Sequence, residues 1–383
     1  MPWKETSPVD QRKEFIREYR RGLFSVMELS ARFAISRKTG YKLIARDDEK
    51  GMAGLRDRSR APQSCPHRTP AVIEALILAA REKHPDWGPQ LLLDWLKPRH
   101  SHIRAWPAVS TAGAILKRAG LVKPRRRRRG TTHPGVVDPV TAVPNDLWTV
   151  DFKGEFRTQD RIYCYPLTMA DQHTRFLLTC QGLTSVKGAE ARPVFERTFR
   201  EYGLPRAIRT GNGAPFVTRA LCGLSHLNVW WMRLGIQHQR IHPASPQENG
   251  AHERMHKTLK RGAIRPPRAN RRTQQRAFDA FRREYNEERP HTYHGGTPPG
   301  HHYTPSPRPY PGKLPPLEYP GHFLVKRVTD AGTFRFHNRL LFIANALQCY
   351  HIGLEEVDDG IWSIYFGSIL LARLDERDCI IRE

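Results

Sequence analysis

The stretch WTVDFK (residues 148–153) alternates large apolar and polar side chains, a pattern typical of a β-strand with one buried face. Trp148, Val150 and Phe152 share the apolar face, and Asp151 lies on the opposite one. Asp is depleted inside strands, so its position indicates a functional carboxylate, although an aspartate near the end of an ordinary strand gives the same pattern. The stretch therefore predicts a buried strand that carries a candidate site residue.

The segments after this strand alternate in type. Two more strands are predicted over residues 161–169 and 175–180, and the turn-like Asp171-Gln172-His173 between them suggests an antiparallel meander. An amphipathic helix over residues 188–202 and a short strand over 207–209 follow. This order predicts a mixed α/β domain.

The loop TGNGAPF (residues 210–216) is rich in turn residues and follows a strand, at the edge where mixed sheets commonly place their sites. PQENG (residues 246–250) then leads into a helix with Met255 and Leu259 on its buried face. The opposite face is predicted to carry Glu253, His256, Lys257 and Lys260. Glu253 among cations fits either a salt bridge within the helix or a metal ligand beside phosphate-binding lysines.

Zinc is disfavoured as an occupant of this helix. His252 and His256 are four residues apart, as in zinc-binding helices, but no third ligand is evident. Six cysteines are scattered without a C-x-x-C pair, which also argues against a disulfide framework and fits a reducing cytoplasm. No apolar stretch is long enough for a membrane span or a secretion signal.

Charge is distributed unevenly along the 383 residues. The chain has 63 Lys+Arg against 38 Asp+Glu, a formal net charge of +25. Residues 1–133 contain 29 basic and 13 acidic residues, whereas residues 318–383 contain 7 and 10. A polyanion is therefore the expected partner of the N-terminal and central parts, and the C-terminal part has another task.

The N-terminal residues predict a helix-turn-helix. A helical pattern covers residues 11–21, Ser25 and Glu28 form a capping box, and Ser36 can cap a further helix over 37–46. The last helix would enter a major groove and carries five candidate DNA contacts, Arg37, Lys38, Thr39, Tyr41 and Lys42. A generic helical hairpin with a solvated basic face is the alternative.

A second helical module is predicted over residues 72–80, 86–95 and 110–118, with its apolar stripe as core. A run of five arginines follows, and would grip phosphates without reading sequence: Arg125, Arg126, Arg127, Arg128 and Arg129. An unstructured solubilising or targeting run is the alternative. Residues 130–144 continue as a linker.

The C-terminal part begins after a proline-rich connector. Six short strand candidates cover residues 323–328, 333–337, 340–343, 350–354, 361–366 and 369–374, and their regular spacing suggests a small barrel. The net negative charge favours a role in assembly, while Lys326, Arg327 and Arg339 leave DNA contact open.

Four motifs carry a family resemblance across residues 147–291: LWTVDFKG from 147, RTGNGAPF from 209, PQENGAHERMHKTLK from 246 and YNEERPH from 285. These motifs and their order resemble those of bacterial insertion-sequence transposases with a retroviral-integrase-type core, and are closest to those of the IS481 group. The helix-turn-helix region and the C-terminal segment are arranged as in that group, so the resemblance covers nearly the whole chain.

The resemblance implies a ribonuclease-H-like core of three antiparallel and two parallel strands, and a C-terminal SH3-like barrel. It implies a metal-binding acidic triad whose first and last members match Asp151 and Glu253, around two Mg²⁺ (or Mn²⁺) ions. Lys153, Lys257 and Lys260 become expected DNA contacts. The expected partner is double-stranded DNA, both the element's terminal inverted repeats and the target, bound by a homo-oligomer in the bacterial cytoplasm and nucleoid.

One member of the triad is absent. The family loop reads Thr-Asp-Asn-Gly, whereas this chain reads Thr210-Gly211-Asn212-Gly213. Gly211 has no side chain to donate, and the loss of one member of a catalytic unit can remove most of the rate. Asp171, Glu155 and Glu248 are nearby acids, but Asp171 and Glu248 match acids that the family already has.

The sequence thus predicts six segments: a helix-turn-helix domain (1–60), a second helical module (66–123), a basic linker (124–144), the core (145–290), the connector (291–320) and a β-barrel (321–383). The expected function is DNA strand cleavage and transfer, impaired by Gly211. A non-catalytic DNA-binding protein, a decayed copy and a generic nuclease of the same fold are the alternatives.

Overall fold

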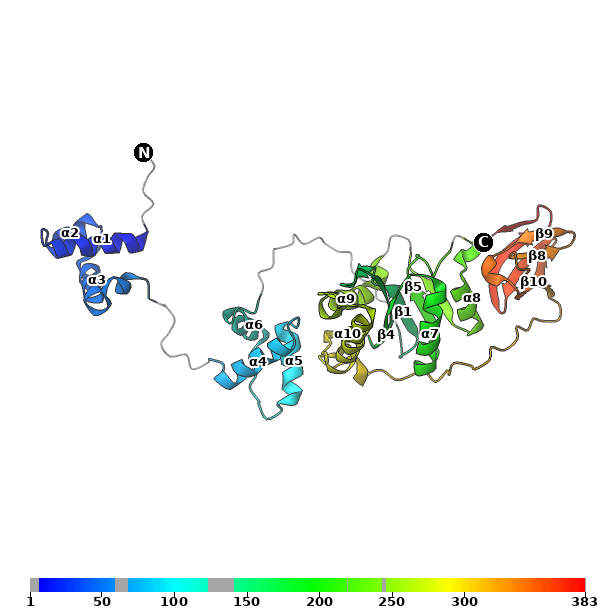
Figure 1. Cartoon of the computed structure of the whole chain (residues 1–383), viewed down its shortest axis with the longest axis horizontal. Coiled ribbons are helices and arrows are strands. Elements are labelled where there is room, and N and C mark those ends of the chain that lie inside the picture. Colours follow the sequence, from blue (N-terminus) through cyan, green and yellow to red (C-terminus); the bar gives the residue numbers. More distant parts are fainter. Residues whose placement is uncertain (1–6, 59–67, 123–140, 219, 243–245, 383) are drawn as a thin grey trace. The chain divides into compact units, whose positions relative to one another are not determined.

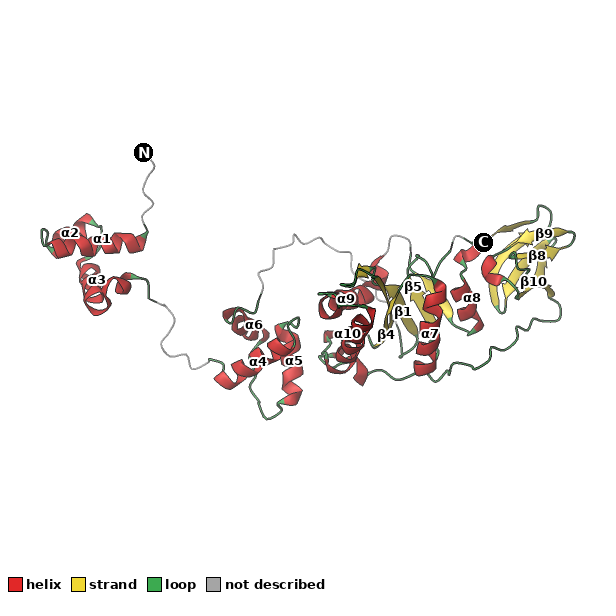
Figure 2. Cartoon of the chain, viewed as in Figure 1, coloured by secondary structure: helices red, strands yellow, loops and turns green. Residues whose placement is uncertain are grey.

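The computed structural model of the chain describes residues 7–58, 68–122, 141–218, 220–242 and 246–382. The chain divides into two compact units, Met1–Arg68 and Thr69–Glu383, and their helices and strands are drawn in Figure 1 and Figure 2. The five arginines from Arg125 to Arg129 lie outside the described residues, so their predicted role stays a prediction.

Three helices form the first unit: α1 (Pro8–Arg21), α2 (Val26–Arg32) and α3 (Arg37–Lys50). Each begins at a serine whose side chain accepts a backbone N–H of the first turn, Ser7, Ser25 and Ser36. The predicted capping box of Ser25 and Glu28 is confirmed. The turn between α2 and α3 includes Ala34 at φ 53°.

The core of this unit is small and tightly packed. Phe15, Ile16 and Leu29 are buried between the helices together with Leu43 and Leu55. Gly40 allows α3 to approach closely, because a Cβ there would lie 2.9 Å from Ser30 Oγ. The five predicted DNA contacts of α3 are all exposed.

Three more helices open the second unit: α4 (Ala71–Lys83), α5 (Pro89–Arg99) and α6 (Val109–Arg118). The predicted apolar stripe is confirmed as core, with Ile73, Ile77 and Ala80 buried against Leu92 and Leu116. Helix α5 begins at Pro89, later than the sequence pattern predicts, since a proline is favoured at the first helical position, where its missing N–H costs nothing.

A mixed sheet forms the centre of the second unit. Strand β1 (Leu147–Phe152) pairs antiparallel with β3 (Tyr163–Asp171), which pairs antiparallel with β4 (Leu177–Leu183). On its other side β1 pairs parallel with β5 (Ala207–Thr210), and β5 pairs parallel with β6 (Gln237–Arg240). The predicted three antiparallel and two parallel strands are confirmed, with β2 (Phe156–Arg157) added beside β3.

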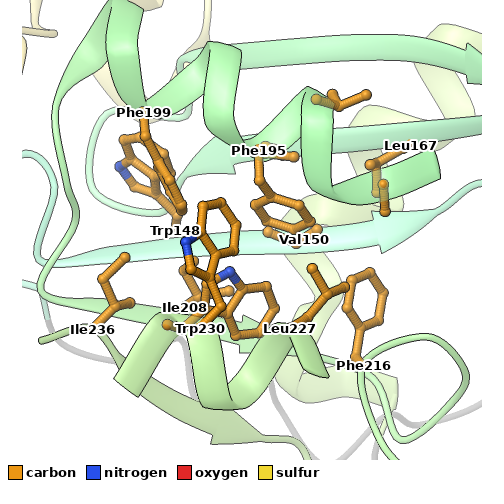
Figure 3. Packing of buried hydrophobic residues seen from close by; sticks show 14 of the residues in the cluster. Trp148, Val150, Leu167, Phe195, Phe199, Ile208, Phe216, Leu227, Trp230 and Ile236 are labelled. Carbon is orange, nitrogen blue, oxygen red and sulfur yellow. The ribbon is translucent and has the colours of Figure 1, made fainter. Parts of the chain in front are cut away.

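Helices cover both faces of this sheet. Helices α7 (Gly188–Tyr202) and α8 (His226–Arg233) pack on the face that carries Trp148 and Val150 (Figure 3). Helices α9 (Gly250–Leu259) and α10 (Arg271–Arg283) pack on the other face, where Met255, Leu259 and Phe278 are buried. Asp151 and Thr149 alternate with Trp148 and Val150 along β1, so they face α9.

The proline-rich connector is fixed to the core. Tyr303 stacks on Phe176 with ring centroids 4.3 Å apart, and its hydroxyl donates to Asn145 Oδ1 at 2.8 Å. Arg308 donates to the backbone carbonyls of Pro205 and Leu234. The segment is extended, as predicted, but its aromatic and arginine side chains anchor it.

The C-terminal part is all-β. Its five-stranded antiparallel sheet runs in the order β13 (Ile380–Arg382), β12 (Ile369–Asp375), β11 (Ile361–Phe366), β10 (His351–Asp358) and β7 (Leu324–Arg327). Strands β8 (Thr333–Phe336) and β9 (Arg339–Phe342) form a separate hairpin. Strands β13 and β7 are the two edges of an open sheet within the described residues, so the predicted closed barrel is not confirmed.

The rest of the described chain adds only short turns to these elements, among them a 3-10 turn at Gly51–Leu55 and two π-helical turns, Lys260–Ile264 and Glu284–Glu288. Across the described residues, none of the helices combines the length and apolarity that a membrane crossing needs.

Candidate active site

The register of the sheet brings Asp151 and Gly211 side by side. Strands β1 and β5 are parallel, with Val150 opposite Thr210. Asp151 is the next residue of β1, Gly211 directly follows the last residue of β5, and neighbouring strands lie about 4.8 Å apart. The first and second positions of the predicted triad are therefore adjacent at the carboxyl end of two central strands.

Helix α9 brings Glu253 to the same place. Met255 and Leu259 anchor the helix in the core, and Glu253 is exposed at its first turn. Burial raises the pKa of the Asp151 carboxyl to about 6, against the lowering effects of the Phe152 backbone N–H and of Lys153, and the negative charge of Glu253 adds to the rise. The carboxylate of Glu253 on α9 thus lies near enough to Asp151 on β1 to disfavour its ionisation.

The buried hydroxyl of Thr168 links β1 to α9 by hydrogen bonds. Thr168 on β3 is fully buried, and its Oγ1 donates to the backbone carbonyl of Asp151 at 2.9 Å. The same oxygen lies 2.7 Å from Nε2 of His252 and 2.7 Å from Nε2 of His256. Because a hydroxyl has one proton, both imidazoles must donate to Thr168. Thr168 therefore connects the β1 strand to α9 on either side of Glu253.

The two histidines are neutral parts of this network. Burial lowers the pKa of His252 to about 3, and burial with the nearby His252 and Lys153 lowers that of His256 to about 2. Nδ1 of His252 lies 2.9 Å from the Thr149 hydroxyl, and Nδ1 of His256 lies 3.8 Å from Asp151 Oδ2. The prediction that His256 lies on the polar face of the helix was wrong, because the ring is buried beside Asp151.

Thr168→Val is expected to destabilise the core by about 2–4 kcal/mol, because it keeps the side-chain volume but leaves buried imidazole N–H groups without an acceptor. Thr168→Ser keeps the hydroxyl and is expected to cost under about 1 kcal/mol. Equilibrium unfolding in urea compares the two variants. Equal losses would contradict the role given to the hydroxyl.

Asp151→Asn is expected to stabilise the metal-free protein at pH 7.5 and to have little effect at pH 4. Since the folded-state pKa is raised, the folded protein holds the proton more tightly than the unfolded chain, and stability falls as pH rises from about 4 to about 6. The side chain is 38% exposed, so the gain is about 1 kcal/mol, well below the full value of the shift.

The measurement is urea unfolding with a chelator at pH 4, 6 and 7.5. Glu155→Gln, which changes an exposed carboxyl nearby in the sequence, serves as the matched control and is expected to show no such trend. A gain for Asp151→Asn that is the same at every pH would show that ionisation of Asp151 is not its cause.

The loop at Gly211 is well anchored but has no carboxylate of its own. Asn212 Nδ2 donates to the Ile241 carbonyl at 2.9 Å, and Thr210 Oγ1 lies 2.9 Å from His238 Nε2. A Cβ built on Gly211 meets nothing within 4 Å, and its backbone is not in the left-handed region. The loop therefore has room for a side chain at this position.

Neighbouring acids are engaged elsewhere. Asp171 is fully buried and accepts the backbone N–H groups of Asn145 and Thr174, both at 2.8 Å, so it caps a turn. Glu248 Oε1 lies 2.6 Å from His242 Nδ1. Among the described residues, no three or more His, Cys, Asp or Glu side chains gather closely enough to hold a metal ion. Asp151 and Glu253 alone leave the donor set of the two-ion site that the resemblance implies incomplete.

The expected DNA contacts of the core have different surroundings. Lys257 on α9 and Lys260 at its C-terminal end are exposed. Lys153 is half-buried, and its positive charge lowers the pKa of Asp151. Sequence reasoning missed Thr168, Thr149 and His238. The spacing of His252 and His256 around Glu253 was a usable signal for the network, but no sequence pattern marked its threonines.

Family models match four parts of the chain. Two described as integrase core domain match residues 142–246 and 234–299. One described as helix-turn-helix domain matches residues 11–63, and one described as homeodomain-like domain matches residues 39–116.

Two curated relatives come from bacterial insertion elements. The chain is 29% identical over 256 residues to the insertion element IS476 uncharacterized 39.2 kDa protein of Xanthomonas euvesicatoria, covering 65% of this chain and 69% of that protein. It is 26% identical over 181 residues to the insertion element IS407 uncharacterized 31.7 kDa protein of Burkholderia multivorans, covering 46% of this chain and 62% of that one.

Solved structures with similarity include the HTLV-2 integrase catalytic core domain in complex with magnesium, at 15% identity and a TM-score of 0.34, covering 42% of this chain and 98% of that one. A simian T-cell lymphotropic virus intasome in complex with PP2A regulatory subunit B56 gamma matches at 16% identity and a TM-score of 0.39, covering 77% of this chain and 97% of that one. The family matches support DNA binding and a function in DNA integration or transposition in general.

Proposed function

This chain is a bacterial insertion-sequence transposase with an integrase-type core, and from that premise we propose that it binds the ends of a mobile DNA element and joins them to target DNA. The observation that carries the proposal is the meeting of Asp151, the Gly211 loop and Glu253 at the carboxyl end of β1 and β5. Catalytic sites of mixed sheets lie at this edge.

Asp151 and Glu253 are the residues proposed to hold Mg²⁺ or Mn²⁺. Hard divalent cations prefer carboxylate oxygens and supply charge stabilisation for phosphoryl transfer. With no donor at Gly211 the donor set is incomplete. We therefore expect the chain to bind DNA well and to join strands weakly.

The other parts have supporting roles in this proposal. Helix α3 reads the element ends through Arg37, Lys38, Thr39, Tyr41 and Lys42, which are exposed. Lys257, Lys260 and the arginines 125–129 hold phosphates, and Lys153 lies beside Asp151. The chain acts as a homo-oligomer on DNA in the bacterial cytoplasm and nucleoid, and the C-terminal sheet contributes to assembly.

We propose the six segments predicted from the sequence as the domains of the chain. Within the described residues, the C-terminal domain is an open antiparallel sheet with a separate hairpin and not a closed barrel. A non-catalytic DNA-binding protein of the same architecture is the second candidate, and the observation that favours it is the missing side chain at position 211.

The test is an oligonucleotide assay that measures binding and joining separately. Duplexes carrying the ends of the DNA segment that encodes the chain are compared with scrambled duplexes. Preferential binding of the ends with weak Mg²⁺-dependent joining supports the proposal. Binding without any joining, even after the acid is supplied at position 211, favours the second candidate, and no preference for the ends contradicts both.

A further inference from the structure

Residues 257–276 contain eight basic residues and no acidic one. They run from the second half of α9, through the connection to α10, and into the first turns of α10. We call them the basic ridge; its members are Lys257, Lys260, Arg261, Arg265, Arg268, Arg271, Arg272 and Arg276. All eight are exposed, so the segment presents a dense positive charge to solvent.

In the described part of the chain, the cations of the ridge have no acidic partners, unlike several exposed arginines elsewhere. Within the described residues, no ion pair or side-chain hydrogen bond involves any of the eight. By contrast Arg118 pairs with Glu74, Arg200 with Glu196 and Arg382 with Asp378.

Spacing within the ridge is electrostatically unfavourable. Arg272 and Arg276 are four residues apart within α10, a spacing at which like charges on an α-helix repel. An anionic partner would relieve this repulsion.

The connection between the two helices is held rigidly by its backbone. Gln274 is fully buried, its Nε2 donates to the Ala263 carbonyl at 2.7 Å, and its Oε1 accepts the Arg268 N–H at 3.0 Å. The N–H groups of Gln159 and Asp160 donate to the carbonyls of Arg268 and Ala269. The arginine side chains therefore project from a fixed frame, which lowers the entropy lost on binding.

The chemistry of the ridge selects its partner. Six of the eight cations are arginines, whose planar guanidinium binds phosphate oxygens in a bidentate way. No large apolar side chain in residues 257–276 is exposed, whereas a membrane-binding helix or a peptide groove needs an apolar surface. The ridge also continues the helix that carries Glu253. A polymer with regularly spaced phosphates fits these features.

We propose that the basic ridge binds the phosphate backbone of duplex DNA without reading its sequence, and holds the duplex along α9 and α10 beyond the site at Asp151 and Glu253. The proposal rests on the proposed DNA function of the chain but not on its joining activity. Binding of this kind releases counterions, so it has a measurable salt dependence.

The experiment measures the affinity of the full chain for two duplexes of unrelated sequence at salt concentrations from about 50 to about 250 mM. Binding through phosphate contacts weakens steeply over this range. The ridge variant carries Arg265→Gln, Arg268→Gln, Arg272→Gln and Arg276→Gln. The matched control carries Arg118→Gln, Arg200→Gln, Arg377→Gln and Arg382→Gln, which remove the same charge from ion-paired arginines.

The magnitude of the slope of log affinity against log salt is expected to fall by about 3.6 in the ridge variant, about 0.9 for each of the lost phosphate contacts, and by less than about 1 in the control. The loss is expected to be equal for both duplexes. Equal changes in the two variants, a loss confined to one sequence, or tighter binding of double-stranded RNA through the same arginines would overturn the proposal.

If circular dichroism shows that the quadruple ridge variant has lost its fold, the single variants Arg272→Gln and Arg276→Gln decide, each with an expected slope change of about 0.9. An unchanged slope in both folded single variants counts against the ridge. Because the measurement needs no strand joining, failure of the joining assay leaves this result interpretable.

Discussion

Gly211→Asp is expected to raise Mg²⁺-dependent strand joining by about 10²-fold or more, because it returns a third carboxylate to a unit whose members act together. The structure gives the substitution room: a Cβ at position 211 meets no atom within 4 Å, and the backbone does not require glycine there. The register of β1 and β5 directs the new side chain to the same level as Asp151. The gain is measured with end-bearing oligonucleotides and a target duplex.

Three variants control this result. Gly213→Asp places the same charge two residues away, also in open space, and is expected to give no gain. Gly211→Asn supplies a similar shape without the charge and is expected to give little. Asp151→Asn in the Gly211→Asp background is expected to return joining to background. Efficient joining by the unmodified chain would contradict the account, and a gain from Gly213→Asp would show that position 211 is not special.

The central sheet and its order of strands could be predicted because the residues that form them have strong local patterns. Trp148, Val150 and Phe152 alternate with polar residues, and the helix at Gly188–Tyr202 has its apolar residues at helical spacing. Serine caps marked the starts of α2 and α3 for the same reason, since a capping hydroxyl acts within three residues of its partner.

Long-range contacts between polar residues could not be predicted. Thr168 joins Asp151 to His252 and His256 across 84 and 88 residues, and nothing near Thr168 in the sequence indicates these partners. The connector shows the same limit, because its prolines predict an extended chain while the anchoring of Tyr303 on Phe176 and Asn145 depends on the folded core. The barrel prediction relied on strand spacing, which does not decide whether the outer strands meet.

The acid at position 211 is also expected to change metal binding itself, before any chemistry. Asp151 and Glu253 provide two carboxylates, and within the described residues no group of three possible ligands is present. A third carboxylate neutralises more of the positive charge of the bound cation and supplies a further oxygen ligand. We expect Gly211→Asp to bind Mn²⁺ at least about tenfold more tightly, which corresponds to about 1.4 kcal/mol.

Titration of Mn²⁺, followed by the electron paramagnetic resonance signal of the free ion, tests most directly whether positions 151, 211 and 253 form one site. If these positions form one site, the unmodified chain and Gly213→Asp bind weakly, Gly211→Asp binds more tightly, and that gain is lost when Asp151→Asn or Glu253→Gln is added. Equal affinities in Gly211→Asp and Gly213→Asp, or a gain that survives both additions, would contradict a single site.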